Sequence, residues 1–234
     1  MNWVVLGSLL LFIASVYTLR LILIIPCFTA ASESNKDGKD SSLLKLKQED
    51  VRGLQLFIFL GSGGHTGEML RLLQNYKNIL LNKDTTLHVG YSDNESLKKM
   101  KKLSDAFECK VKFYEFKKAR EVGANVKSSL KTIIVTLLAS LMHVVNIKLH
   151  MLNKPHLVLL NGPGTCCIIT TWFKLIDLLC LFTSSNIIYV ESLARIKTLS
   201  LTGKILYWLA DEFVVQWKDL QTPYPRSKHF GILV

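Results

Sequence analysis

The sequence predicts an α/β fold, in which a single Rossmann-like, doubly wound parallel sheet follows one transmembrane helix. Three observations support this fold class. Short apolar, β-rich runs alternate with helix-length segments along most of the chain. Runs such as LFIFL at 56–60 and LVLL at 157–160 are apolar on both faces, as buried parallel strands are. An apolar stretch of membrane-spanning length stands at the N-terminus.

That first stretch runs from Trp3 to Phe28, and Arg20 is its one charged residue. At about 1.5 Å per residue it can cross a hydrocarbon core of about 30 Å. No Lys or Arg precedes it, which argues against a cleaved signal peptide, although the small residues at 29–31 keep that alternative open. The basic residues come late in the stretch or after it, so we expect the N-terminus in a lumen and the remainder in the cytosol.

The rest of the chain divides into a tether and one folded domain. We expect the anchor over residues 1–30, a Ser-, Lys- and Asp-rich tether over 31–53 and an α/β domain over 54–234. Expected strands are 54–60, 86–91, 111–116, 156–160, 187–190 and 213–217, and expected helices are 67–80, 95–107, 128–151, 166–182 and 202–209. Segments 132–145 and 168–182 are apolar enough to raise the question of further spans. Their shortness and polar residues favour core helices, with bilayer contact by the first left open.

Composition narrows the function classes. The chain has 29 basic and 18 acidic residues, a net charge of +11, and a mean hydropathy of +0.27. No zinc finger, helix-turn-helix or RNA-binding aromatic motif accompanies this charge, so nucleic-acid binding is disfavoured. The lysine cluster at 98–102 is interpreted as a solvated helix face, with contact to anionic lipid as the alternative. Five cysteines without framework spacing predict buried, reduced thiols.

A glycine-rich loop follows the first expected strand. Gly61, Ser62, Gly63, Gly64 and His65 stand directly before a helix, where glycines allow close backbone approach and helix N-terminal amides face a bound anion. A dinucleotide site is the rival interpretation, because Thr66 replaces only the third glycine of G-x-G-x-x-G and Asp93 could imitate a ribose-binding acid. The ionisable His65 argues against that rival, and a purely structural role for His65 stays open.

Two more polar loops follow later strands. The first contains Asn161, Gly162, Pro163, Gly164 and Thr165, with Thr165 able to cap the next helix. The second contains Glu191 and Ser192, with Arg195 four residues beyond the acid. Each loop alone is equally consistent with a simple turn or cap. Because parallel strands end at one edge of a sheet, the three loops are expected to converge on one crevice.

These motifs in combination resemble one protein family. Residues 61–68 (GSGGHTGE), 161–166 (NGPGTC), 189–192 (YVES), 198–206 (TLSLTGKIL) and 231–234 (GILV), with KAREV at 118–122, carry the resemblance. They are similar to the membrane-anchoring subunit of the eukaryotic UDP-N-acetylglucosamine transferase of dolichol-linked oligosaccharide synthesis, and the fungal members in particular. The similarity covers nearly the whole chain, including the N-terminal anchor.

The resemblance implies a place in a two-chain enzyme. Family members sit on the cytosolic face of the endoplasmic reticulum membrane, with the nuclear envelope as a further location, and recruit a small soluble subunit that holds the UDP-sugar. Together they add the second N-acetylglucosamine, in β-1,4 linkage, to dolichyl-diphosphate N-acetylglucosamine. Each subunit resembles one half of a bacterial single-chain GT-B glycosyltransferase, and this chain matches the N-terminal, acceptor-facing half. No cofactor or metal ion is implied, and the sequence has no Asp-x-Asp motif.

Site roles follow as expectations. The predicted acceptor diphosphate and sugar site comprises Gly61, Ser62, Gly63, Gly64, Thr66, Asn161, Gly162, Gly164, Thr165, Ser192 and Arg195. His65 is the candidate general base, and Glu191 is the alternative base or a group that orients the sugar. Arg120 and Arg195 could bind phosphate, or pair with a nearby acid.

The apolar C-terminus is expected at the partner interface or as a closing strand; it comprises Phe230, Gly231, Ile232, Leu233 and Val234. Two rival functions stay open at this point. The chain could be a recruitment scaffold without catalytic residues, or a membrane-tethered dinucleotide-binding oxidoreductase. The identity of the base, bilayer contact by 128–151 and the oligomeric state of the complex are undecided by the sequence.

Overall fold

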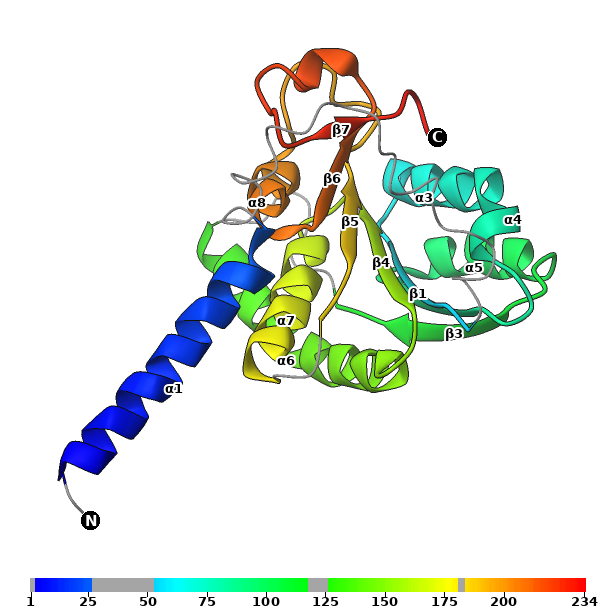
Figure 1. Cartoon of the computed structure of the whole chain (residues 1–234). Helices are drawn as coiled ribbons and strands as arrows, with labels where there is room; N and C mark the ends of the chain where they lie inside the picture. The colour runs from blue at the N-terminus through cyan, green and yellow to red at the C-terminus, as the bar shows by residue number, and fades with distance from the viewer. Residues whose placement is uncertain (1–2, 27–52, 118–125, 181–183) are drawn as a thin grey trace.

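The computed structural model describes residues 3–26, 53–117, 126–180 and 184–234 (Figure 1). Within them lies a seven-stranded sheet of order β3-β2-β1-β4-β5-β6-β7, in which every neighbouring pair is parallel. The strands are β1 (Gln55–Leu60), β2 (Thr86–Tyr91), β3 (Lys110–Glu115), β4 (His156–Asn161), β5 (Ile187–Val190), β6 (Glu212–Val215) and β7 (Lys228–His229). The predicted fold class, a doubly wound parallel sheet, is confirmed. The short β7 was not among the predicted strands.

The strand order reverses direction next to β1. The chain runs outward from β1 through β2 to β3, then crosses back to β4 on the other side of β1 and continues outward to β7. Gln55 is in register with both Thr86 of β2 and His156 of β4. Loops that leave β1 and β4 therefore turn to opposite faces of the sheet. The sheet edge between them, where open α/β sheets bind ligands, is here called the crevice.

Helices cover both faces of the sheet. On one face lie α3 (Gly64–Asn75), α4 (Lys77–Leu80) and α5 (Asn94–Ser104), and on the other lie α6 (Val126–Met151), α7 (Thr165–Leu179) and α8 (Leu201–Leu209). Alternation along β1 separates the two cores, since Phe57 and Phe59 face α6 and α7 while Leu56, Ile58 and Leu60 face α3. The helix expected over 67–80 is interrupted at Tyr76, which ends α3 and precedes α4.

Both apolar helices of the domain contribute to its core. Ile169 and Phe173 of α7 and Val144 and Ile147 of α6 are fully buried. Lys148 of α6 forms a buried ion pair with α7 at Asp177. The core-helix prediction is thus confirmed for α7. In α6, Ile134–Met151 is still long and apolar enough to cross a membrane, although 33% of that window is buried in the domain.

The N-terminal helix α1 (Trp3–Ile24) is the other candidate span, with none of its most apolar window buried (Figure 1). Hydrogen bonds join its C-terminal end to the domain. The Arg20 guanidinium donates to backbone carbonyls at the end of α7, including that of Asp177 at 2.7 Å. Lys174 Nζ donates to the carbonyl of Ile24 at 3.1 Å. The anchor therefore meets the domain at α7, while the expected tether lies outside the described residues except for Gly53.

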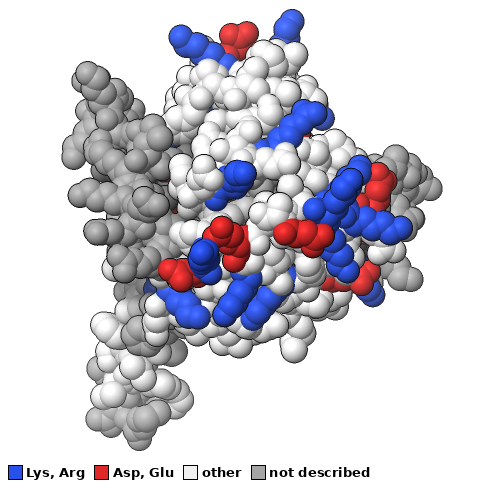
Figure 2. All heavy atoms as spheres, turned by 90° about the vertical axis from the view of Figure 1, so that its right-hand side faces the viewer, with Lys and Arg blue, Asp and Glu red and all other residues white. Residues whose placement is uncertain are grey.

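The lysines of α5 lie away from the anchor. Figure 1 shows α5 beside β2 and β3, at the opposite edge of the sheet from α8 and α1. Figure 2, which views that side, shows Lys and Arg interspersed with Asp and Glu, and Lys99 pairs with Glu95 at 2.7 Å. This placement supports a solvated helix face over contact with anionic lipid.

Among the described cysteines, Cys109 and Cys166 are buried, Cys167 is partly buried and Cys180 is exposed. The predicted burial is therefore wrong for Cys180, which directly follows the end of α7. Burial raises the pKa of the Cys167 thiol to about 11. The fifth, Cys27, lies outside the described residues.

Candidate functional site

The two glycine loops meet at the crevice beside β1 and β4. A Cβ on Gly61 would lie 2.6 Å from Cδ of Pro163, and a Cβ on Gly162 would lie 2.6 Å from Cγ of His65. Gly162 also has a φ of 107°, which side-chain-bearing residues rarely adopt. The backbones therefore approach as closely as they do only because both positions are glycine, and the predicted convergence of these loops is present.

The start of α3 is open to solvent. Ser62, Gly63 and Gly64 are exposed, and the N-cap residue Gly63, with a φ of 62°, makes no side-chain cap. The first amides of α3 consequently lack an acceptor from a capping side chain, and the helix dipole favours an anion at this point. This geometry suits the predicted diphosphate.

Thr66 lies behind the glycine loop. It is 1% exposed, and its hydroxyl donates to the carbonyl of Gly61 and lies 2.6 Å from Ser96 Oγ. Ser96 Oγ donates to the same carbonyl at 2.9 Å, and its amide donates to the Asp93 carboxylate, which caps α5. In this structure Thr66 braces the loop from behind instead of lining its open surface. Asp93 is engaged as a helix cap, which weakens the dinucleotide interpretation.

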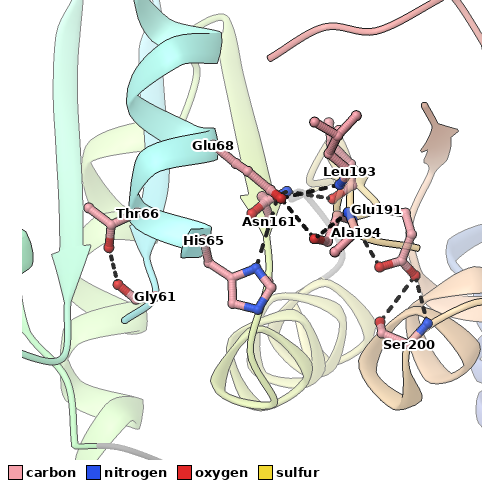
Figure 3. A network of polar contacts seen from close by, with 12 residues as sticks. Gly61, His65, Thr66, Glu68, Asn161, Glu191, Leu193, Ala194 and Ser200 are labelled. Carbon is pink, nitrogen blue, oxygen red and sulfur yellow. Dashed lines mark hydrogen bonds and ion pairs between the residues drawn. The ribbon is translucent and has the colours of Figure 1, made fainter. Parts of the chain in front are cut away.

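Glu68 joins three elements of the crevice (Figure 3). Its Oε2 accepts from Asn161 Nδ2 at 2.9 Å, while its Oε1 accepts from Ser192 Oγ at 2.8 Å and from the amide of Leu193 at 3.2 Å. One carboxylate on α3 thus holds the ends of β4 and β5. Two of the predicted site residues, Asn161 and Ser192, are brought together by it.

His65 stands over this junction. Its Nδ1 faces Glu68 Oε2 at 4.0 Å, and Figure 3 shows the other ring nitrogen turned away from that carboxylate. The side chain is 36% exposed, yet Nδ1 is buried without a hydrogen-bond partner among the described residues, as is Asn161 Oδ1. The imidazole thus presents one nitrogen to a carboxylate, at a distance longer than a hydrogen bond, and turns the other away from it.

Glu191 points in a different direction. It is 1% exposed, its Oε1 accepts from the amide of Ser192 at 2.9 Å, and its Oε2 accepts from the amide and hydroxyl of Ser200 at 3.1 Å each. A Cβ on Gly203 would lie 1.9 Å from Oε2, so the carboxylate packs against the start of α8. Burial raises the pKa of Glu191, and these hydrogen bonds oppose the rise. Its geometry is that of a support for the β5–α8 connection.

The remaining predicted site residues differ in their exposure to solvent. Arg195 and Gly164 are exposed at the crevice loops, and Gly164 occupies the N-cap position of α7 that was expected of Thr165. Thr165 is buried as the first residue of that helix. Arg120 lies outside the described residues. No group of three or more His, Cys, Asp or Glu side chains that could hold a metal ion occurs in the described part of the chain.

The C-terminal segment lies along the α3 side of the sheet. Asn75 Nδ2 donates to the carbonyl of Leu233 at 2.9 Å, and the amide of Leu233 donates to Gln216 Oε1 at 3.2 Å. Leu233 and Val234 pack against the core there, while Phe230 and Ile232 are 40% and 58% exposed. The closing strand is β7, which ends just before Phe230, so a strand over the last five residues is not observed.

Comparison with known proteins identifies the family. Residues 56–233 match the family described as "Oligosaccharide biosynthesis protein Alg14 like". The chain belongs to this family. It is 55% identical over 233 residues to the UDP-N-acetylglucosamine transferase subunit ALG14 of Saccharomyces cerevisiae, covering 98% of both chains. The proteins of the same name in Candida glabrata and Schizosaccharomyces pombe are 49% and 40% identical, over 97% and 76% of this chain and 96% and 82% of their own. Among solved structures, Acinetobacter baumannii MurG is similar at a TM-score of 0.46 and 11% identity, over 69% of this chain and 40% of that one.

Within this Alg14-like chain, the residue that sequence reasoning missed is Glu68. It was part of the glycine-loop motif, but no role was assigned to it. The usable signal is its spacing, because residues three apart on a helix face the same side and Glu68 follows His65 by three. An acid one turn into a helix that starts at a ligand-binding loop is a candidate for orienting a histidine on that loop.

Proposed function

We propose that this chain is the membrane-anchoring, acceptor-binding subunit of a two-chain UDP-N-acetylglucosamine transferase. Family membership and the printed names of its relatives support this assignment. The main structural observation in its favour is that both glycine loops and the loop after β5 meet around His65 and Glu68. The described residues form one Rossmann-like sheet, whereas a GT-B enzyme needs two such units flanking a cleft. The second unit, which holds the UDP-sugar, would come from a small soluble partner.

The proposed reaction is transfer of the second N-acetylglucosamine to dolichyl-diphosphate N-acetylglucosamine, in β-1,4 linkage and with inversion. An acceptor whose lipid stays in a bilayer accounts for α1, and its diphosphate accounts for a glycine-rich helix start in a basic protein. The site would lie on the cytosolic face of the endoplasmic reticulum membrane, with residues 1–30 as anchor and 54–234 as the transferase half. Without its partner the chain would have no donor site and no activity.

In the proposed mechanism, the acceptor diphosphate lies against the amides of Gly63, Gly64 and His65. The imidazole nitrogen turned away from Glu68 takes the proton of the sugar 4-hydroxyl as that oxygen attacks the anomeric carbon of the donor. The bond from that carbon to UDP breaks, and UDP leaves with the electron pair. Glu68 orients the ring and stabilises the imidazolium that forms, as a carboxylate does beside other catalytic histidines.

Neighbouring residues have supporting roles in this proposal. Asn161 is buried and donates through its amide nitrogen to Glu68 and to the carbonyl of Val190, so in this proposal it joins the ends of β4 and β5 to α3. The exposed Arg195 could bind the diphosphate through its guanidinium. Glu191 keeps the β5 loop in place and has no exposed oxygen for the alternative role of base.

Sugar transfer by the co-purified pair tests the proposal. His65→Ala is expected to lower kcat by about 100-fold or more while the partner still co-purifies with membranes. Glu108→Ala, at an exposed pair with Lys83 that lies apart from the ring and from the C-terminal segment, serves as a control that retains activity. Near-normal transfer by His65→Ala at saturating acceptor would show that His65 is not the base.

The two rival functions give different results in the same preparation. If glycine-loop variants bind the partner and all transfer normally, the chain is a recruitment scaffold. Binding of a nicotinamide cofactor in titration, without sugar transfer by the pair, would support the oxidoreductase. Sugar transfer that requires both chains would exclude the oxidoreductase.

A further inference from the structure

Helix α8 carries an exposed apolar stripe. Leu201, Ile205 and Trp208 are 72%, 45% and 56% exposed. Their spacing of four and three places them on one face of the helix, while Leu206 and Tyr207 on the opposite face are buried in the core. The stripe is therefore a surface of α8 that the described part of the domain leaves exposed.

One end of the stripe lies at the crevice. Leu201 directly follows Ser200, the N-cap of α8, whose amide and hydroxyl bind Glu191. Glu191 in turn accepts from the amide of Ser192, which is bound to Glu68 beneath His65. A chain of direct hydrogen bonds thus links Ser200, the N-cap of α8, to the proposed catalytic junction.

The other end lies at the membrane anchor. Asp211, just beyond the end of α8, pairs with Lys174 at 2.7 Å, and Lys174 Nζ also donates to the carbonyl of Ile24, the last residue of α1. Figure 1 shows α8 beside that end of α1. If α1 spans the bilayer, Trp208 lies near the lipid–water boundary, where tryptophan is enriched.

The stripe connects these two points. A nine-residue helix is about 13 Å long, so α8 extends from the N-cap that binds Glu191 to Asp211, which is joined through Lys174 to the end of α1. A lipid-linked diphosphate in the crevice must bring the first part of its chain out of the bilayer. Along a polar surface, that part of the lipid chain would be exposed to water, which is unfavourable for a hydrocarbon.

Charge on the same face fits such a molecule. Lys204 is exposed between Leu201 and Trp208 on the helix surface, and Arg195 and Lys197 are exposed in the preceding loop around the half-exposed Ile196. Apolar contacts flanked by cations match an isoprenoid chain that ends in a diphosphate. Lys204 can lay its methylenes along the apolar stripe with its ammonium in solvent.

We propose that Leu201, Ile205 and Trp208 bind the diphosphate-proximal isoprene units of the acceptor lipid between the bilayer and the crevice. This inference rests on the proposed function, because it assumes that a lipid-linked diphosphate occupies the crevice. It assigns α8 a role in recognising the lipid, separate from the residues that act on the sugar.

Chain-length dependence of the acceptor tests the proposal. The double variant Leu201→Asn/Ile205→Asn is expected to raise KM for dolichyl-diphosphate N-acetylglucosamine in mixed micelles by about tenfold. KM for an analogue that carries one citronellyl group should not change, since that chain is too short to follow α8. Ile79→Asn is the matched control, because Ile79 is 45% exposed on α4 at the opposite face of the sheet.

Three outcomes would overturn the proposal. They are an unchanged KM for both acceptors, an equal rise for both, and loss of the partner from the purified variant, which would make α8 a partner surface. Crosslinking by a diazirine-bearing dolichyl diphosphate separates this proposal from the proposed function. A pair that transfers no sugar could still show crosslinks to residues 196–208 that are lost in the double variant. That result would refute the proposed reaction and retain the lipid site. Sugar transfer without such crosslinks would refute only the lipid site.

Discussion

The two acids at the crevice, Glu191 and Glu68, differ in their surroundings. Glu191, on the β5 side, is buried and its oxygens accept from backbone and hydroxyl donors of Ser192 and Ser200. Glu68, on the α3 side, is 14% exposed and faces a histidine nitrogen that has no partner among the described residues. The first arrangement is complete without a ligand, and the second is not. In the proposed mechanism, the β5 side maintains the shape of the crevice while the α3 side acts on the acceptor.

The strongest test of this comparison is to remove the buried acid. Glu191→Ala would leave the amides of Ser192 and Ser200 buried without their acceptor, so we expect a loss of about 3 kcal/mol in the free energy of unfolding. Urea unfolding of the detergent-solubilised pair measures it. Glu212→Ala, which breaks a partly exposed pair with Lys228, should cost less than about 1 kcal/mol. If the two variants were equally stable, the supporting role of Glu191 would be wrong.

The contact between the glycine loops gives the next largest effect. Gly162→Ala would place a methyl group against the His65 ring at a positive φ, so we expect a loss of about 2 kcal/mol in stability and a displaced imidazole. Transfer should fall nearly as far as in His65→Ala. Gly67→Ala is the matched control, because Gly67 lies within helix α3 and nothing lies within 4 Å of its Cβ position. Equal activity of the two variants would mean that His65 does not need this contact.

Glu68→Gln should have a smaller effect, and mainly on catalysis. Loss of the charge beside His65 removes stabilisation of the imidazolium, so we expect kcat to fall about tenfold with the partner still bound. Steady-state sugar transfer by the co-purified pair measures this change. Glu95→Gln, on exposed α5, is the control. An unchanged kcat would leave Glu68 only as a brace between loops.

The smallest expected effect is on the pH dependence of stability. Burial raises the pKa of Glu191 in the folded protein above its unfolded value of about 4.5. The contribution of this pKa difference to the free energy of unfolding is therefore fully present below the unfolded pKa. It is lost as pH rises through the folded pKa. Glu191→Gln should therefore flatten the decrease in stability with rising pH over that interval. Unfolding midpoints measured across that interval provide the test. An unchanged slope would mean that another group is responsible for the pH dependence.

The sequence predicted the fold class because buried parallel strands are apolar on both faces, and β1 and β4 follow that pattern closely. It predicted the crevice because loops after parallel strands share one edge. It did not separate Thr66 and Glu191 from the open surface of the site, since a side chain's direction depends on packing with elements distant in sequence, here Ser96 and Ser200. For the same reason, the role of Glu68 became apparent only when β4 and β5 were placed beside α3.

The docking of α1 against α7 has a consequence for how the anchor works. Because Arg20 and Lys174 bind the end of α1 to the domain, the segment between residues 26 and 53 connects two points on one body, and its length does not set the distance between membrane and crevice. If α1 spans the bilayer, the crevice would instead be held at a fixed height above it. Under the proposed function, the acceptor would then be selected by how far its reacting hydroxyl extends from the membrane. A lipid bearing one sugar would reach His65, and a longer product would extend past it.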